Sequence, residues 1–174
     1  MLRPSIVFGP EDSFFNRFAA MARVAPFLPL IGGGETKFAP VFAGDVAEAV
    51  VRLVDKGEAD GQTYELGGPE VLSFRQLLQF TLDTIGRNRL LLSLPWGVAK
   101  LQAALMGLLP RPPLTMDQVE LLKSDNVVSA EARRELRTLE GLGITPQGIE
   151  AIVPAYLYRY RKAGQFTAPK GIPE

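Results

Sequence analysis

The chain has 174 residues, with 19 basic and 19 acidic side chains and no net charge at pH 7. This length is enough for one domain with a buried core, and zero net charge gives no electrostatic footprint for nucleic acid. Cysteine and histidine are both absent. Disulfides, thiol nucleophiles and thiolate zinc sites are therefore excluded, and the commonest general base and metal ligand is missing. We expect no metal site.

The first element expected is a buried strand at residues 5–8. This run is β-branched and aromatic, and Gly9 and Pro10 end it in a loop. It is apolar on both faces, as a central parallel strand is, and such a strand needs neighbours. Only a few residues precede it, so the flanking strands must come from later in the chain, from another copy or from a missing part.

Helical spacing of Phe14, Phe18 and Ala22 predicts a short helix that ends before Pro26. The glycines at 32–34 predict a hairpin turn rather than a phosphate-binding loop. A phosphate loop runs from strand to helix, whereas residues 36–42 continue in an extended pattern. Lys37 also stands where the Gly-x-Gly-x-x-Gly pattern needs its third glycine.

Three further elements alternate between helix and strand, which indicates an α/β layer rather than a helical bundle. Asp45 is the expected N-cap of a helix that stops at Gly57. Residues 61–66 alternate as a strand. Ser73 and Gln76 form a Ser-x-x-Gln capping box that opens a helix ending at Gly86.

Residues 90–109 are strongly apolar, but Pro95, Gly97 and Lys100 interrupt the run, so we expect no transmembrane helix. Two interpretations stay open. The segment is either a strand and helix of a smaller lobe, or a surface that docks on a membrane protein or interface through Trp96 and its leucines.

Three helices are expected in the remaining sequence. Thr115 begins the first, and Ser129 begins the second, whose charges indicate a solvated surface with opposite-sign pairs. Thr145 and Pro146 begin the third.

This last helix contains Tyr158 and Lys162 at the Tyr-x-x-x-Lys spacing of a dehydrogenase catalytic pair. The spacing places a phenol and an ammonium on one helix face. The pattern is also common by chance in a basic helix end, so we expect no catalytic residue here.

Several motifs carry a family resemblance. The segment Arg-Pro-Ser-Ile-Val-Phe-Gly-Pro at residues 3–10 is similar to the strand that follows the catalytic helix in extended and atypical short-chain dehydrogenase/reductases. The segments at residues 11–19, 34–42 and 45–47 resemble one branch of that family. That branch is the nucleotide-binding accessory subunit of respiratory complex I and its bacterial relatives.

The resemblance corresponds to the second half of that family's chain. It implies that the glycine loop and the catalytic pair lie upstream of residue 1, and that this branch works without a catalytic pair. It places Arg3, Pro4, Ser5 and Ile6 at the nicotinamide end of an NADP or NAD cofactor. It also suggests Asn16 and Arg17 as substrate-side candidates.

The expected fold is therefore α/β: the C-terminal part of a Rossmann-type sheet plus a smaller, mainly helical substrate-side lobe, with the N-terminal Rossmann half missing. We expect the sheet remnant at residues 1–89, the helical lobe at 90–164 and a flexible tail at 165–174.

The expected function is a non-catalytic, NAD(P)H-binding-type accessory subunit of NADH:quinone oxidoreductase. The alternative is the substrate-binding part of an NAD(P)-dependent sugar-nucleotide epimerase, dehydratase or reductase. Expected partners are complex I subunits or a second copy of the chain, with peripheral membrane contact through residues 90–109. No secretory signal is visible, so we expect a cytoplasmic location, peripheral on the cytoplasmic face of the inner membrane.

Overall fold

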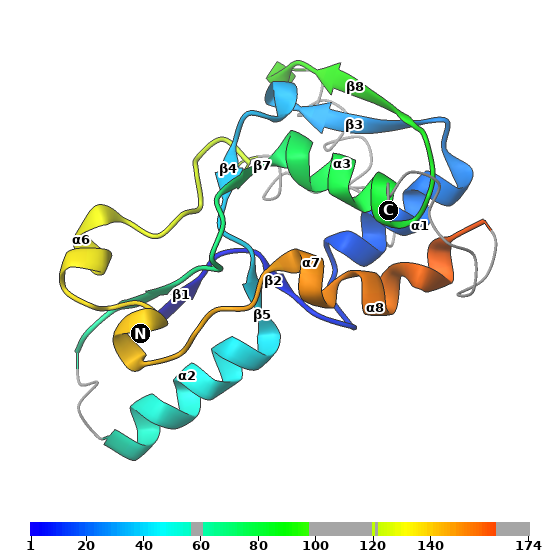
Figure 1. Cartoon of the computed structure of the whole chain (residues 1–174). Coiled ribbons are helices and arrows are strands. Elements are labelled where there is room, and N and C mark those ends of the chain that lie inside the picture. Colours follow the sequence, from blue (N-terminus) through cyan, green and yellow to red (C-terminus); the bar gives the residue numbers. More distant parts are fainter. Residues whose placement is uncertain (57–60, 98–119, 121, 163–174) are drawn as a thin grey trace, which may run out of the picture.

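The computed structural model describes residues 1–56, 61–97, 120 and 122–162. Within these residues the strands form four two-stranded ladders, three parallel and one antiparallel, with helices between them (Figure 1). The expectation of an α/β architecture is confirmed. Residues 98–109 of the apolar run, the first turns of the helix expected after Thr115 and the tail at 165–174 lie outside the described residues.

The opening segment forms two short strands rather than one. Strand β1 (Leu2–Pro4) pairs in parallel with β6 (Tyr64–Leu66), and β2 (Val7–Phe8) pairs in parallel with β5 (Val41–Phe42). The expected neighbours thus come from later in the chain. The prediction of one continuous strand at residues 5–8 was wrong, because the chain bends between the two ladders.

Ser5 accounts for the bend. Its side chain is buried, and its Oγ donates to the carbonyl of Asn126 at 2.6 Å and accepts the N–H of Ala39 at 3.1 Å. A buried hydroxyl needs such partners, so the backbone turns to place it inside. Beyond the bend Phe8 is fully buried while Val7 is exposed.

The glycine-rich segment does not form a hairpin. Strand β3 (Phe27–Ile31) pairs in parallel with β8 (Leu90–Leu94), whereas β4 (Lys37–Phe38) pairs antiparallel with β7 (Leu72–Ser73). The 3-10 turn η1 (Gly32–Gly34) carries the chain from one ladder to the other. All three glycines have positive φ, which side-chain-bearing residues rarely adopt. The hairpin prediction was wrong because a turn signal does not say which strands pair.

Three longer helices connect the ladders: α1 (Phe15–Val24), α2 (Ala43–Lys56) and α3 (Phe74–Thr84). The predicted capping box of α3 is confirmed. The Ser73 side chain accepts the N–H of Gln76 at 3.2 Å, and the Gln76 side chain accepts the N–H of Ser73 at 2.8 Å.

Asp45 is not the N-cap of α2, because it lies inside the first turn of the helix. Its carboxylate is buried and accepts the backbone N–H of Gln147 at 2.8 Å and the side-chain N–H of the same residue at 3.3 Å. Negative charge in a first turn still complements the helix dipole. The cap prediction failed because a distant segment supplies the donors.

The C-terminal part is more broken than predicted. It contains α6 (Ala130–Arg134), η2 (Glu140–Leu142), α7 (Ile149–Ile152), α8 (Pro154–Leu157) and η3 (Tyr158–Tyr160). The single last helix predicted from residue 145 was wrong. The first turn begins after Gly148, and the proline that opens α8 has no N–H to continue a helix.

One core cluster joins α1, α3, β3 and the α7–α8 segment. Its fully buried members include Phe15, Leu28, Leu77, Val153 and Leu157. A second cluster lies under α2 and includes Val41, Ala49 and Leu139. The last described segment is therefore part of the core and not an appendage.

A polar contact fastens that segment to the loop after β2. The hydroxyl of Tyr156 donates to Asp12 Oδ2 at 2.5 Å, and only 7% of the Tyr156 side chain is exposed. Burial disfavours the phenolate, and the Asp12 carboxylate accepts a hydrogen bond from the protonated phenol and repels the phenolate. Both effects hold the pKa of Tyr156 well above the ordinary tyrosine value.

Replacing Ser73 by Ala should lower the free energy of unfolding by about 1 kcal/mol, because it removes one half of the capping box. Urea denaturation measures the change. Ser93→Ala, at an exposed position on β8, is the matched control and should stay within roughly 0.5 kcal/mol of the parent. Equal effects of the two substitutions would contradict the capping role.

Tyr156→Phe should cost about 1.5–3 kcal/mol at neutral pH, since it removes a hydrogen bond to a charged acceptor. Tyr158→Phe, an exposed tyrosine, should cost little. Because the folded pKa of Tyr156 is raised, its contribution is complete below about pH 10, where a free tyrosine ionises. It is lost as the pH rises further, since the unfolded chain releases the proton first.

The advantage of the parent over Tyr156→Phe should therefore shrink above about pH 10, by up to about 1.4 kcal/mol per pH unit. Denaturation curves between pH 8 and pH 11 test this. A difference that does not depend on pH would show that the tyrosine contributes by packing alone.

Candidate functional site

The four residues expected at the nicotinamide end lie on β1 and in the bend after it. The side chains of Arg3 and Pro4 are exposed, that of Ser5 is buried and that of Ile6 packs partly against the larger core cluster. Several polar atoms of the bend already have partners in the chain. Ser5 N–H donates to the carbonyl of Leu66, and the carbonyl of Ile6 accepts from Val41, both at 2.9 Å.

Asn16, a substrate-side candidate, is held by the chain itself. Its side-chain amide donates to the carbonyls of Pro10 and Asp12 at 3.1 and 3.0 Å. Its side-chain oxygen accepts from Arg159 at 2.6 Å. Arg17 follows on α1 and is half-buried. The contacts of Asn16 close the loop after β2 and connect it to the C-terminal segment.

Asp12, Tyr156 and Arg159 therefore complete a polar cluster around Asn16 that the sequence did not reveal. Asp12 also accepts the backbone N–H of Asn16 at 3.2 Å. The partners are 144 and 143 residues apart in the chain, so no local spacing connects them. The only sequence signal was an acidic residue four positions before Asn16, which is typical of a helix start.

The described residues do not fit a dinucleotide pyrophosphate. Such a group sits at a helix N-terminus whose backbone N–H groups are available. In α1 the carboxylate of Asp12 occupies this position, in α2 a buried Asp45 lies in the first turn, and in α3 Ser73 caps the helix. The glycine turn at Gly32–Gly34 leads into a strand, in agreement with the expectation that it is no phosphate loop.

Tyr158 and Lys162 do not lie on one helix. Tyr158 begins the 3-10 turn η3, and the backbone becomes extended at Arg161, before the lysine is reached. The pair therefore lacks the common helix face on which the lysine could lower the pKa of the phenol. Tyr158 is exposed, and no described contact orients its hydroxyl.

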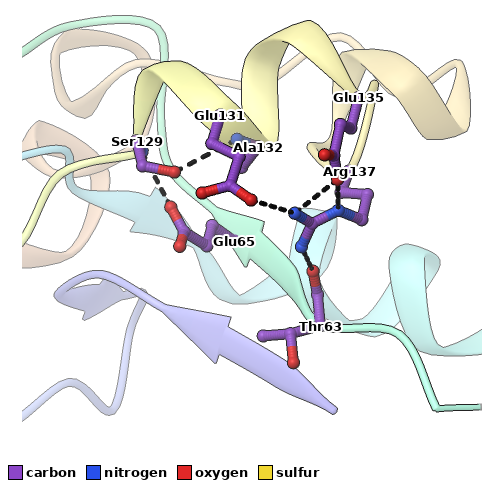
Figure 2. A network of polar contacts seen from close by, with 7 residues as sticks. All are labelled: Thr63, Glu65, Ser129, Glu131, Ala132, Glu135 and Arg137. Carbon is purple, nitrogen blue, oxygen red and sulfur yellow. Dashed lines mark hydrogen bonds and ion pairs between the residues drawn. The ribbon is translucent and has the colours of Figure 1, made fainter.

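A second polar network joins α6 to β6 (Figure 2). Glu65 on β6 accepts the backbone N–H of Ser129 at 2.7 Å, and Ser129 caps α6 as predicted. Arg137 donates to the carbonyl of Thr63 at 2.5 Å and pairs with Glu135 at 2.6 Å. The charges of this region are therefore not only a solvated surface, because one arginine fastens the strand.

An open depression of about 510 Å³ lies beside this network, lined by Gly61, Gln62, Thr63, Glu135 and Arg137. None of the predicted site residues lines it. Its arginine is already neutralised by glutamates, so the depression offers no free charge to a ligand.

In the described part of the chain, the acidic side chains form no cluster of three or more that could hold a metal ion. Among its helices, none combines the length and the apolar character that crossing a membrane requires.

Comparison with known proteins gives relatives by sequence, although no family model matches. Subunit 9 of the mitochondrial NADH dehydrogenase [ubiquinone] 1 alpha subcomplex from Arabidopsis thaliana is 36% identical and matches 94% of this chain. The mouse protein of the same name is 31% identical over 92% of the chain. The mitochondrial 40 kDa subunit of NADH-ubiquinone oxidoreductase from Neurospora crassa is 25% identical over 97%. The chain spans only 42–43% of the length of these relatives.

Solved structures share the fold at low identity. A dTDP-glucose 4,6-dehydratase from Streptomyces venezuelae, solved with NAD bound, superposes with a TM-score of 0.60 at 19% identity. An epimerase from Methanothermobacter thermautotrophicus gives 0.62 at 16%, and a UDP-glucose 4-epimerase from Thermotoga maritima gives 0.59 at 17%. Each match covers 91% of this chain and 41–44% of the other.

The four ladders and three connecting helices are thus part of the Rossmann-like fold of NAD-dependent epimerases and dehydratases. By sequence, as its motifs indicated, the chain is a homologue of part of the mitochondrial proteins named NADH dehydrogenase [ubiquinone] 1 alpha subcomplex subunit 9.

Proposed function

We propose that this chain is part of an accessory subunit of NADH:quinone oxidoreductase and contributes structure and partner contacts rather than catalysis. The single observation that carries the proposal is the sequence similarity over 94% of the chain to a subunit of that complex. Since the chain spans 42% of that relative, the remaining functions of such a subunit would depend on a longer protein.

The absence of catalysis is supported by the geometry of the described residues. The one spacing that suggested a dehydrogenase pair, Tyr158 and Lys162, is divided by the end of η3. The strongest pKa shift belongs to Tyr156, whose hydroxyl is bound to Asp12 in a structural contact. A proton donor of this kind stabilises the fold and is not poised near neutral pH.

Nucleotide binding would require an N-terminal half that lies outside these 174 residues. In that arrangement Arg3, Pro4, Ser5 and Ile6 would border the nicotinamide of an NAD or NADP. Asn16 and Arg17 would lie on the substrate side. The Rossmann-like fold and the NAD-bound neighbours support this assignment. The oxygens of Asp12, Asp45 and Ser73 at the starts of the three longer helices argue that the pyrophosphate site is elsewhere.

The proposed location is peripheral, on the cytoplasmic face of the inner membrane, with the run at residues 90–109 as the partner surface. Self-association through the strand expected at residues 5–8 is the other mode of assembly. Among the described strands, β2 pairs with β5 alone, which leaves one edge open and supports this mode. An epimerase or dehydratase function has weaker support, because the matches to such enzymes described above are 19% identical or less and concern the fold alone.

The isolated chain should bind NADH or NADPH weakly. Calorimetric titration with either nucleotide should show no saturable heat in the micromolar range, because the three longer helices of the described chain carry Asp12, Asp45 or Ser73 at their starts instead of a glycine loop with free N–H groups. The NAD-binding dTDP-glucose 4,6-dehydratase serves as the positive control. Micromolar binding by the isolated chain would contradict the proposed division of the site.

Membership of the complex is tested by affinity isolation. A tagged chain, expressed in cells that contain NADH:quinone oxidoreductase, should recover core subunits of the enzyme from detergent-solubilised membranes. Leu90→Asp should lower the recovery, whereas Val54→Asp, at an equally exposed position on α2, should not. Recovery of no oxidoreductase subunit by the parent chain would overturn the proposal.

A further inference from the structure

Four arginines gather at one end of the β3–β8 ladder. Arg23 is in the last turn of α1, Arg87 and Arg89 are in the connection between α3 and β8, and Arg161 follows η3. The ladder lies at one end of the molecule, where α1 and α3 also end (Figure 1). Segments far apart in the sequence therefore deliver positive charge to the same place.

Hydrogen bonds to helix ends fix the positions of three of these arginines. In each case the Nε–H donates to a backbone carbonyl: Arg89 to Ala22 at 2.9 Å, Arg87 to Tyr160 at 3.1 Å and Arg161 to Thr84 at 3.0 Å. A cation suits the negative end of a helix dipole. The bond uses only one of the five N–H groups of a guanidinium, so most donors remain for another partner.

No carboxylate neutralises the group within the described residues. The ion pairs of the described chain involve other arginines and lysines. The acidic residue next in sequence, Asp83, accepts a hydrogen bond from Gln79 instead. Partial burial and the nearby charges of Arg89 and Arg23 lower the pKa of Arg87. Like charges close together disfavour one another's charged form, so a bound anion would stabilise the four arginines.

Exposed apolar side chains adjoin the arginines. Phe27 faces Leu90, and Pro29 faces Leu92, in the register of the β3–β8 ladder. Exposed fractions are 45% for Phe27, 77% for Leu90 and 49% for Leu92, while Leu28 and Leu30 point into the core. Val24, which follows Arg23, is 86% exposed. One face of the ladder is thus apolar and open, and its amino end is basic.

We propose that the basic–apolar surface, formed by Arg23, Arg87, Arg89, Arg161, Val24, Phe27, Leu90 and Leu92, binds the interface of a membrane that contains anionic lipids. The arginines would contact phosphates of the headgroups, and the apolar side chains would enter the layer beneath them. Peripheral binding of this kind scales with buried apolar area and with attraction to anionic lipid. The inference deepens the peripheral contact of the proposed function and therefore rests on it.

Either an anionic membrane or an acidic protein could neutralise the arginines, and the exposed apolar side chains beside them favour the membrane. An acidic protein would neutralise the arginines but would need a separate apolar patch in the right place for Phe27 and Leu90. An anionic interface supplies both environments in one layer, with phosphate above and hydrocarbon below. The exposed side chains lie on a two-stranded ladder rather than in a groove, which suits a flat surface.

Vesicle sedimentation tests the proposal with the purified chain. Binding to phosphatidylcholine vesicles containing about one third phosphatidylglycerol should be clear at low salt, weaker at high salt because charges are screened, and weak on pure phosphatidylcholine. Arg23→Glu should lower the partition coefficient about tenfold or more, since each basic residue near the surface contributes roughly a fivefold factor. Arg134→Glu, an exposed arginine on α6, is the charge-matched control and should have little effect.

A second comparison, between two double variants, tests how much the apolar side chains contribute to vesicle binding. Leu90→Ser combined with Leu92→Ser should lower partitioning several-fold, whereas Val50→Ser combined with Val54→Ser, on exposed α2 positions, should not. Circular dichroism and urea midpoints verify that every variant folds, and variants that unfold are replaced by Arg23→Gln and Leu90→Ala.

Equal loss in the Arg23→Glu and Arg134→Glu variants would overturn the proposal, because binding would then follow net charge alone. Binding to soluble polyglutamate without binding to anionic vesicles would also overturn it, in favour of an acidic protein partner. Because the test needs only lipid, its failure leaves complex membership standing. Conversely, vesicle binding without recovery of oxidoreductase subunits would reject the proposed function alone.

Discussion

The arrangement of the chain depends on the buried hydroxyl of Ser5. Its Oγ contacts Asn126 and Ala39, and its backbone N–H contacts Leu66. Four segments, separated by up to 121 residues in sequence, meet at this one residue. A buried polar group without partners is costly, so each of these segments is fixed in register by the need to satisfy the others. The bend at Ser5 directs β1 to one parallel partner and β2 to another.

Polar side chains that the chain itself uses also explain why the described residues offer no site for the pyrophosphate of a nucleotide. Asp12, Asp45 and Ser73 place oxygens at the starts of the three longer helices. A Rossmann fold holds the pyrophosphate at the helix N-terminus of its first βα turn, where backbone N–H groups are free. The fold of NAD-dependent epimerases is present, but the feature that holds the cofactor's charge is not among these residues. A Rossmann-like fold can thus be present in a set of residues that does not include the pyrophosphate site.

The C-terminal segment links the two surfaces discussed above. Tyr156 and Arg159 fasten it to the loop after β2, while Arg87 and Arg161 fasten its end to α3. The arginines therefore have two roles. The Nε–H groups of Arg87 and Arg161 bind carbonyls at helix ends, which stabilises the fold. Their remaining donors belong to the basic–apolar surface proposed to bind anions.

The sequence by itself determined the elements that local chemistry decides. The Ser73 capping box, the cap at Ser129, the helix after residue 14 and the α/β alternation were predictable, because each depends on residues within a few positions. The motifs at residues 3–47 also indicated the relatives. Tertiary structure decided which strands pair. The glycines at 32–34 signal a turn but not that it joins two ladders. Asp45 resembles a cap, yet Gln147, 102 residues away, supplies its partner. The Asp12–Tyr156 contact and the arginine cluster likewise arise only when distant segments meet, because side-chain spacing carries no information about long-range neighbours.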